Sequence, residues 1–472
     1  MTHDYTGPEL CALSAVEAVG LLERGEVSPA EMIEAAMARI EAVEPKINAM
    51  PTTCAERAKA MAAKLERGGE ATWLAGLPIA IKDLSPVAGV RTTWGTKAFA
   101  EFVPEESDPL VEMMERRGGV VIGKTNTPEM GAGANTFNDV FGRTRNPWNV
   151  KLNPGGSSGG AAAALATGEV WLAHGSDMGG SLRTPAAYCG VVGLRPTPGR
   201  CGGGGKDNAF SGLGLSGPMA RNVEDCALFL DAMAGSDPRQ PLTFDPPAES
   251  FLSQVRRAGP PKRVAFSADF GGFGPVTKEV RDLMAAAMRR LEGLGTVVEE
   301  RDPNVEGLIE TNMALRGLSF AIGPGSLPAE VRRHFKKTLQ ENCAFGEALT
   351  LPEIVKAERH RSAMVLEMER LTRGFDALAC PVVGLGPLDS EVEFPTEVDG
   401  VPTPHYMDWL RFAHLASTLG LPALSVPIGF TASGAPMGIQ LIGRHRDEAG
   451  ILAVAKAIES VTEGFGRPID PR

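Results

Sequence analysis

The stretch PGGSSGGAAAALATGEVWLAHGSDMGGSLRTPAAYCGVVGLR, residues 154–195, carries the strongest signals for both fold and chemistry. Its alanine-rich residues 159–167 predict a helix that ends at Gly168, because glycine readily adopts the left-handed conformation that terminates helices. Apolar runs at 170–173 and 191–194 predict two buried strands. The glycine pairs before Ser157 and Ser181 predict tight turns that leave backbone N–H groups unhindered beside each hydroxyl.

Outward from this stretch, short apolar runs alternate with helical patterns along most of the chain. We expect strands at 77–81, 120–122, 263–266, 296–299 and 422–427, and helices at 107–119, 447–461 and through most of 302–374. Such alternation is typical of an α/β protein with a largely buried sheet. The sequence therefore predicts an α/β/α domain in which helices cover a large, twisted, mixed sheet.

Two helices are expected before the first of these strands. Ser28-Pro29-Ala30-Glu31 forms a capping box with proline at the first helical position, and Pro45 is expected to stop the helix. The second helix is expected at 54–67, ending at Gly68-Gly69. We predict one domain over 1–472, comprising a helical segment (1–70), a core (74–235), a variable region (236–400) and a C-terminal return to the core (401–472).

Three polar residues stand out as candidates for chemistry. Lys82 ends an apolar run, so it is either a solvated strand end or a buried amine whose lowered pKa makes it a usable base. Ser157 lies in a GGSSGG segment that alone equally fits a flexible loop or an anion-binding helix N-terminus. Ser181 follows two glycines and fits either an oxyanion-stabilising turn or a simple tight turn.

Taken together, the three segments in this order resemble the amidase signature family of serine hydrolases. The resemblance covers residues 154–195 almost position by position, and it extends to GLPIAIKD (76–83), GGVVIGKTNTPEM (118–130), RNPWN (145–149) and LGLPALSVPIGF (419–430). The region 236–400 carries little of it. The resemblance implies a carboxylic amidase that acts through an acyl-enzyme, with a carbamate hydrolase as the alternative.

The resemblance also implies a role for each site residue. Ser181 would be the nucleophile, Ser157 would follow a cis peptide bond and bridge to Ser181, and neutral Lys82 would accept the proton. This chain of roles is a recognised variant of the serine-histidine-aspartate logic. The oxyanion and substrate-binding groups would be the backbones of Met178, Gly179, Gly180 and Ser181, with Gly131 nearby, and the supporting residues would be Gly156, Ser158, Asp177 and Arg183.

Composition excludes several other classes. Lys and Arg number 47 against 58 Asp and Glu, a formal charge of −11 with no basic stripe, which disfavours nucleic-acid binding. We expect no membrane span and no signal peptide. The seven cysteines are scattered without a CxxC pair, which indicates reduced thiols, a cytoplasmic protein and no structural zinc. We expect no metal and no cofactor; a homodimer is implied by the resemblance alone.

Competing motifs have weaker support. Residues 118–125 match the GxxxxGK[ST] expression of a phosphate-binding loop, but here the variable positions form the strand itself. His174, His405 and His414 have no partner motif, and Cys189 has the apolar neighbours of a buried structural thiol. The role of a subunit in a tRNA-dependent amidotransferase, which shares the family core, remains an alternative because only the middle region argues against it.

Substrate choice lies outside what these motifs specify. Met178 stands where the family usually has threonine, which leaves the backbone donor intact and narrows the space beside it. The glycine-rich residues 200–217 predict a mobile loop that admits bulky substrates. Residues 302–400 are expected to shape the pocket. The first expectation is an aryl or alkyl amide of modest size.

Overall fold

The computed structural model describes residues 5–65, 73–202 and 208–472. Its centre is an 11-stranded sheet in the order β1-β3-β2-β6-β8-β7-β14-β15-β11-β9-β10. Parallel pairs join β2 with β3 and β6, and β9 with β10 and β11, whereas the remaining pairs are antiparallel. The expected mixed sheet of an α/β protein is therefore confirmed. The strands of this sheet are β1 (Thr52–Thr53), β2 (Pro78–Lys82), β3 (Val120–Thr125), β6 (Leu172–Asp177), β7 (Val192–Arg195), β8 (Leu215–Ala220), β9 (Arg263–Phe266), β10 (Val297–Glu300), β11 (Ala377–Pro381), β14 (Ala423–Phe430) and β15 (Pro436–Ile442).

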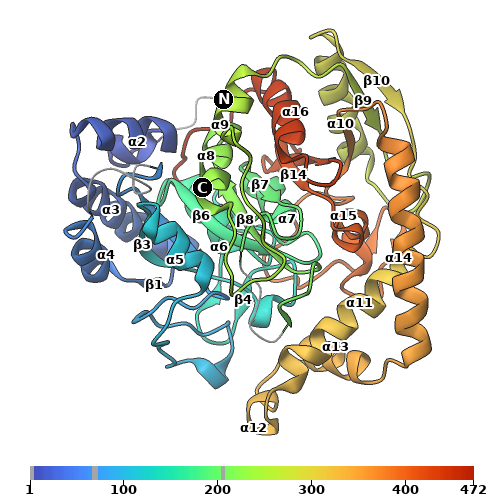
Figure 1. The fold of residues 1–472 in the computed structure, drawn as a ribbon, viewed down its shortest axis with the longest axis horizontal. Helices are drawn as coiled ribbons and strands as arrows, with labels where there is room; N and C mark the ends of the chain where they lie inside the picture. The colour runs from blue at the N-terminus through green and yellow to red at the C-terminus, as the bar shows by residue number, and fades with distance from the viewer. Residues whose placement is uncertain (1–4, 66–72, 203–207) are drawn as a thin grey trace.

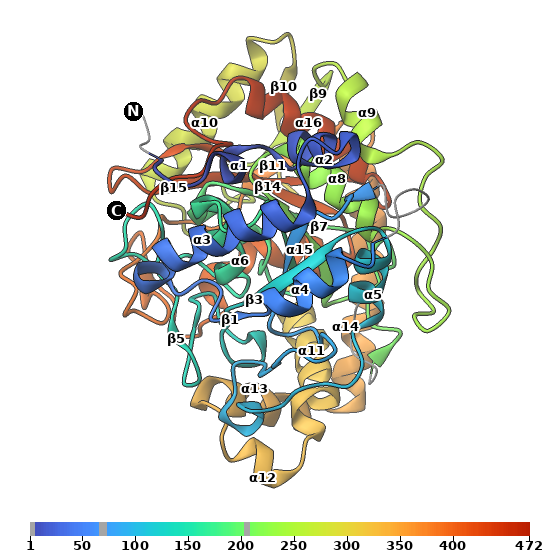
Figure 2. The same ribbon diagram turned by 90° about the vertical axis from the view of Figure 1, so that its left-hand side faces the viewer.

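Helices of the N-terminal segment lie on one side of the molecule (Figure 1), and α3 and α4 lie in front of the strands in the view of Figure 2. The capping box at Ser28 and Glu31 is present, with Pro29 in the first turn. The expected stop at Pro45 is wrong: the helix continues to Ile47, because a proline so near the end removes only one hydrogen bond, and Asn48 in the left-handed conformation ends it. These helices are α1 (Glu9–Ala12), α2 (Ala15–Arg24), α3 (Pro29–Ile47) and α4 (Ala55–Ala62).

Two groups of helices pack on the central strands. In the first group, α6 packs on β2 and β6 and contacts α7, which lies on β14 and β15. In the second group, α8, α9 and α16 contact one another, with α8 on β8 and α16 on β14. The alanine-rich helix α6 ends at Gly168 as expected, because this glycine adopts the left-handed conformation with φ of +79°. Its four consecutive alanines and their neighbours are all buried. Their bounds are α5 (Pro109–Arg116), α6 (Gly159–Thr167), α7 (Arg183–Cys189), α8 (Val223–Met233), α9 (Phe251–Arg257), α10 (Lys278–Glu292) and α16 (Glu448–Ser460).

One expected helix start is wrong. Helix α5 begins at Pro109 rather than Ser107, because Asp108 caps it by accepting the Leu110 N–H at 2.9 Å. The Ser107 hydroxyl instead accepts the N–H of Ala88 at 2.9 Å and so fixes a neighbouring loop. The strand expected at 120–122 is also longer than expected, since β3 extends to Thr125 and pairs in parallel with β2 through Lys82.

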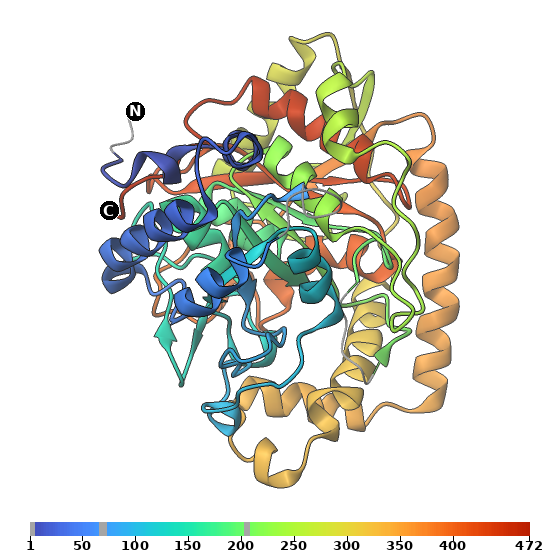
Figure 3. The same cartoon turned by 60° about the vertical axis from the view of Figure 1, so that its left-hand side comes forward.

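Helices from the middle of the chain form a separate edge of the molecule, and Figure 3 shows the long helix α14 standing opposite the N-terminal helices. The expectation that 302–374 is mainly helical is confirmed. The elements are α11 (Leu308–Ile322), α12 (Ala329–Arg332), α13 (Lys337–Glu347) and α14 (Leu351–Thr372), followed after β11 by the β12–β13 pair (Glu397–Val398, Val401–Pro402), the 3-10 helix η6 (Asp408–Ala413) and α15 (His414–Leu419). Short strands β4 (Phe137–Asn138) and β5 (Gly142–Arg143) pair outside the main sheet, and further short 3-10 turns are η2 (Lys97–Phe99), η3 (Glu129–Gly131) and η5 (Pro324–Ser326).

A continuous hydrophobic core extends from Cys11 in α1 to Ile458 in α16. All seven cysteines are free thiols, and all except Cys54 are buried. Within the described residues, no helix is long and apolar enough to cross a bilayer. The second helix, expected at 54–67, is shorter than expected, because α4 ends at Ala62. Residues 66–69 of that expectation and much of the predicted mobile loop (203–207) lie outside the described residues.

Candidate active site

Lys82 is the last residue of the buried strand β2, and its side chain is completely buried. Its Nζ lies 2.6 Å from Oγ of Ser157, 2.9 Å from Oγ of Ser158 and 3.1 Å from Oγ of Ser176. No carboxylate contacts this amine among the described residues. Burial lowers the pKa of Lys82 to about 7, against the opposing attraction of Asp177. A large fraction of Lys82 is therefore neutral near pH 7.

Ser157 lies at the start of the turn into α6, and the peptide bond between Gly156 and Ser157 is cis, as the resemblance implied. Glycine is required at both preceding positions because the backbone of neighbouring segments is so close. A methyl group on Gly155, whose φ is +77°, would lie 2.8 Å from Cα of Pro185, and one on Gly156 would lie 3.0 Å from the carbonyl carbon of Ala134. This packing directs Ser157 toward Lys82.

Ser158 and Ser176 complete the surroundings of the lysine. The Ser158 hydroxyl accepts the backbone N–H of Ser176 at 3.3 Å, and the backbone N–H of Ser158 donates to the carbonyl of Ser181 at 3.1 Å. These bonds bring the turn before α6, the end of β6 and the loop of Ser181 together around one amine. Sequence reasoning placed Ser158 among the supporting residues but missed Ser176, for which the only available signal was its position one residue before Asp177.

Ser181 lies in the loop between β6 and α7 and is partly exposed. No hydrogen bond joins the hydroxyls of Ser157 and Ser181 in the part of the chain that the structure describes. Ser157 is instead engaged by Lys82. Hydrogen bonds between nucleophile and base are often long in substrate-free enzymes and tighten in the substrate complex.

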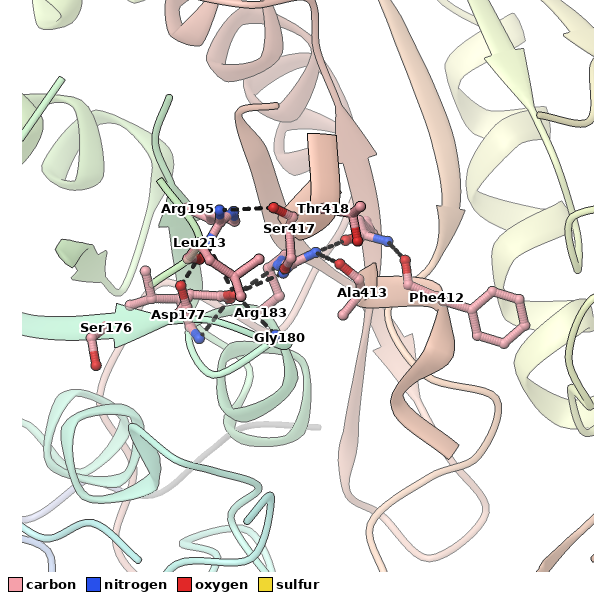
Figure 4. A network of polar contacts seen from close by, with 12 residues as sticks. Ser176, Asp177, Gly180, Arg183, Arg195, Leu213, Phe412, Ala413, Ser417 and Thr418 are labelled. Atoms are coloured by element: carbon pink, nitrogen blue, oxygen red, sulfur yellow. Dashed lines mark hydrogen bonds and ion pairs between the residues drawn. The ribbon is translucent and has the colours of Figure 1, made fainter. Parts of the chain in front are cut away.

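Asp177, at the end of β6, organises the Ser181 loop through a buried network (Figure 4). Its carboxylate accepts the N–H groups of Gly180 and Leu182, each at 3.0 Å. Arg183 binds the same carboxylate through two hydrogen bonds, and Arg195 donates to the Asp177 carbonyl at 2.5 Å. Burial alone would raise the pKa of Asp177, but Arg183 holds it below its usual range. Both arginines are also anchored to the C-terminal part of the chain: Arg183 bonds Ala413, Ser417 and Gln440, and Arg195 bonds the Ser417 carbonyl.

The backbone donors near Ser181 fall into two groups. The Gly180 N–H is committed to Asp177, and the Gly131 N–H donates to the carbonyl of Pro128 at 2.8 Å. The N–H groups of Met178, Gly179 and Ser181 have no acceptor within the described residues. Gly131 nevertheless lies at the site, because a methyl group there would be 3.4 Å from Oγ of Ser157.

Apolar side chains form one wall beside these donors. Met178 is partly buried and packs against two small hydrophobic clusters that lie outside the main core. One cluster contains Phe320 of α11 and Leu339 of α13, and the other contains Leu315 of α11. The expected role of residues 302–400 therefore has a physical basis, because α11 and α13 meet the Ser181 loop through Met178.

Residues of the competing motifs lie in settings unsuited to the chemistry considered for them. Lys124 is buried within β3 and pairs with the Asp83 carboxylate at 3.0 Å, so it is not presented to a phosphate. His174 and His414 are buried, and burial lowers the pKa of each to about 3. Cys189 is fully buried, and burial raises the pKa of its thiol. The described residues contain no cluster of potential metal ligands.

Comparisons with known proteins agree with this architecture. A family model described as Amidase matches residues 31–452. A glutamyl-tRNA(Gln) amidotransferase subunit from Moorella thermoacetica is 36% identical over 488 residues, covering 96% of this chain and 98% of that protein. An acylamidase of Rhodococcus erythropolis is 35% identical over 458 residues, covering 95% of each chain. The crystal structure of a bacterial aryl acylamidase superposes with a TM-score of 0.88 at 28% identity, covering 96% of this chain and 97% of that one.

These likenesses define the class as hydrolases of the amidase type. The family model spans most of the chain, and the curated relatives match it along nearly their full length. The chain belongs to the amidase signature family. The resemblance seen in the sequence is thereby confirmed.

Proposed function

We propose that this protein hydrolyses the C–N bond of a carboxylic amide, with Ser181 as the nucleophile and Ser157 and Lys82 as its proton relay. The observation that carries the proposal is the 2.6 Å contact between the Lys82 amine and the Ser157 hydroxyl, at an amine whose pKa burial lowers to about 7. A serine hydroxyl is a poor nucleophile without a base, and a neutral buried amine supplies one.

In the proposed resting state Lys82 is a neutral amine with one lone pair and two N–H groups. The lone pair would accept the Ser157 proton, and the N–H groups would donate to the hydroxyls of Ser158 and Ser176, with the Ser176 carbonyl 3.4 Å from Nζ. Ser157 in turn accepts the proton of Ser181 once substrate draws the two hydroxyls together. Ser158 and Ser176 therefore orient the lone pair toward the relay.

The reaction proceeds in two halves. Ser181 Oγ bonds to the carbonyl carbon while its proton passes through Ser157 to Lys82, and the tetrahedral intermediate then collapses with return of that proton to the departing nitrogen. Water attacks the resulting ester by the same relay, releasing the carboxylic acid and restoring Ser181. The N–H groups of Met178, Gly179 and Ser181 would hold the oxyanion, each donor typically contributing about 100- to 1,000-fold to the rate. Gly180 was also expected in this oxyanion hole, but we leave it out of the proposal because its N–H donates to the Asp177 carboxylate.

An aryl or alkyl amide of modest size is the proposed substrate. The likeness to acylamidases supports it, and so does the apolar wall formed at Met178 by α11 and α13. A panel of 4-nitroanilides, simple amides and aryl carbamates, assayed on the purified protein with and without EDTA, tests the proposal. We expect amide turnover that EDTA leaves unchanged. Turnover of carbamates alone, or loss of activity in EDTA, would contradict it.

A second candidate is the amidotransferase role, in which the protein releases ammonia from glutamine within a complex. The 36% identity to the Moorella thermoacetica amidotransferase protein favours this candidate. It predicts glutaminase activity that depends on partner subunits, so the protein alone would be inactive on anilides. Affinity purification from its native cells, followed by a glutaminase assay, separates the two candidates.

A further inference from the structure

Arg316 on α11 is a buried cation held among neutral groups. The residue is 6% exposed, and its guanidinium carbon lies 4.1 Å from the ring centroid of Phe320 and 5.5 Å from that of Tyr406. Its hydrogen bonds go to the Asn342 amide oxygen at 3.0 Å and to the Tyr406 hydroxyl. Among the described residues, no carboxylate forms an ion pair with it.

The surroundings of Arg316 carry more donors than acceptors. The Tyr406 hydroxyl accepts hydrogen bonds from Arg316 and from the Asn342 amide at 2.9 Å, and it donates none within the described residues. Its phenolic proton is thus available. Burial raises the pKa of Tyr406, so the phenol stays neutral and does not offset the charge of Arg316. Burying an uncompensated cation is costly, and an anion that completes the site removes much of that cost.

This cationic cluster adjoins the loop that carries the nucleophile. Met407 follows Tyr406 directly, and its methyl group lies 3.1 Å from where a side chain on Gly179 would begin. Phe320, stacked on the guanidinium, belongs to the same hydrophobic cluster that Met178 packs against. The Arg316 cluster is therefore linked to the Ser181 loop by two sets of contacts, one through Met407 and one through Phe320 and Met178.

His414 is a further buried residue near Arg316 whose ring nitrogens form no hydrogen bond within the described residues. It lies at the start of α15 and is 1% exposed. Arg316 is among the charges that lower the pKa of His414, after burial, so the two side chains lie close enough to interact. A neutral imidazole beside the cation can donate one further hydrogen bond to a bound oxygen.

We infer that Arg316, with the Tyr406 hydroxyl, forms a subsite for a carboxylate carried by the substrate at the end remote from the scissile amide. This inference rests on the proposed amide hydrolysis and narrows its substrate class to amides that bear a carboxylate. An arginine fork suits a carboxylate because it offers two parallel N–H groups. The net charge of −11 repels anions at long range, so selectivity for one depends on a local buried cation such as this.

Matched substrate pairs test the subsite. One pair places the carboxylate on the acyl part, namely succinyl and glutaryl 4-nitroanilides against their ω-carboxamide analogues. The other places it on the amine part, namely 4-acetamidobenzoate against 4-acetamidobenzamide. In the wild-type protein we expect kcat/KM for the carboxylate member to exceed that of its neutral analogue by about tenfold or more in one of the two pairs, as is typical of a hydrogen-bonded charge.

Two substitutions locate the effect. In Arg316→Gln, the ratio of kcat/KM between the charged and the neutral substrate should fall to near one, while kcat/KM for the neutral analogue stays within severalfold of its wild-type value. If the glutamine variant does not fold, Arg316→Lys replaces it; it keeps the charge but loses the paired N–H groups, so the ratio should fall in part. Arg333→Gln, an exposed arginine just after α12, is the matched control and should leave the ratio unchanged. A purely structural role for Arg316 would lower turnover of both members equally and leave the ratio intact.

The outcomes separate this inference from the proposed function. Equal turnover of charged and neutral members by the wild-type protein overturns the carboxylate subsite and leaves amide hydrolysis standing. Turnover of neither member overturns both. A charged-to-neutral ratio that stays at its wild-type value in Arg316→Gln shows that another residue recognises the carboxylate and overturns the assignment. Where the glutamine variant does not fold, an unchanged ratio in Arg316→Lys overturns it in the same way.

Discussion

Two hydrogen bonds, of 2.7 and 3.0 Å, join the Arg183 guanidinium to the Asp177 carboxylate, and both side chains are fully buried. The same carboxylate receives the N–H groups of Gly180 and Leu182, the residues on either side of Ser181. The pair therefore sets the conformation of the loop that carries Ser181, the proposed nucleophile. It also leaves the Gly180 N–H unavailable to the proposed oxyanion hole.

Replacing Arg183 with Gln should destabilise the fold by about 3–5 kcal/mol, because it leaves a buried carboxylate without its partner. Urea unfolding followed by circular dichroism measures the change. Arg373→Gln is the control, since Arg373 pairs with Glu369 at the surface and its loss should cost less than about 1 kcal/mol. Similar losses in the two variants would contradict the structural role given to the Asp177–Arg183 pair.

Substitution of Ser181 by Ala or Lys82 by Met should each lower kcat on a 4-nitroanilide by roughly 10⁴-fold or more, as in other nucleophile–base systems. The double variant should be little worse than either single one, because the two residues act in one relay. Lys97→Met, at an exposed surface lysine, should retain full activity. Substantial turnover by Ser181→Ala would rule out the acyl-enzyme on that residue.

The pH dependence of kcat/KM should report the Lys82 amine. Since only the neutral amine accepts a proton, activity should fall about tenfold per pH unit below about 7 and level off above it. The depressed pKa also makes a stability prediction. The unfolded chain binds this proton up to about pH 10.4 and the folded chain does not, so the contribution of Lys82 to stability rises with pH between about 7 and 10.4.

Lys82→Met should remove both features. Its residual activity should lose the inflection near pH 7, and its stability relative to the wild type should be greatest at low pH, where the buried amine would otherwise have to be protonated. A wild-type profile with no inflection between pH 6 and 8 would argue against a neutral lysine base.

Shortening Met178 to Ala should reduce kcat/KM by about tenfold for substrates with bulky apolar groups, because the apolar contact that Met178 offers a substrate is lost. The loss should be smaller for an acetyl amide of the same amine. Met61→Ala, in α4 and remote from the site, is the control. Equal losses across the substrate series would place Met178 outside the pocket.

Alanine at Gly155 should destabilise the protein more than alanine at Gly89. Both glycines have positive φ, +77° and +72°, so the conformational cost is similar. Only Gly155 is crowded, since its new methyl group would lie 2.8 Å from Cα of Pro185, whereas that on Gly89 meets nothing within 4 Å. The difference, about 1–3 kcal/mol, is the expected cost of overpacking. Equal melting temperatures would show that the turn before Ser157 tolerates the added volume.

Much of the fold and the choice of site residues could be predicted from the sequence, because their signals are local. Alanine richness and a terminal glycine define α6, and an apolar run ending in lysine defines β2. The motif carrying Ser157 and Ser181 is a contiguous stretch whose glycines leave room for neighbouring backbone. Helix ends are predicted less accurately, because α5 begins where the Asp108 side chain accepts an N–H group and α3 ends where the Asn48 backbone adopts the left-handed conformation.

Other features of the site depend on contacts between residues far apart in the chain. Nothing near Ser176 indicates that its hydroxyl meets an amine that is 94 residues away. The commitment of the Gly180 N–H follows from the orientation of a carboxylate held by Arg183. The burial of Arg316 follows from the packing of α11 on α13, in the region where the family resemblance is weakest.

The groups proposed for bond cleavage belong to β2, to the turn before α6 and to the loop between β6 and α7, whereas the surfaces that would meet the rest of the substrate come from α11 and α13. Met178 joins the two parts. An engineer could therefore randomise the inward faces of those two helices, leave the strands untouched, and screen for new substrates without rebuilding the chemistry.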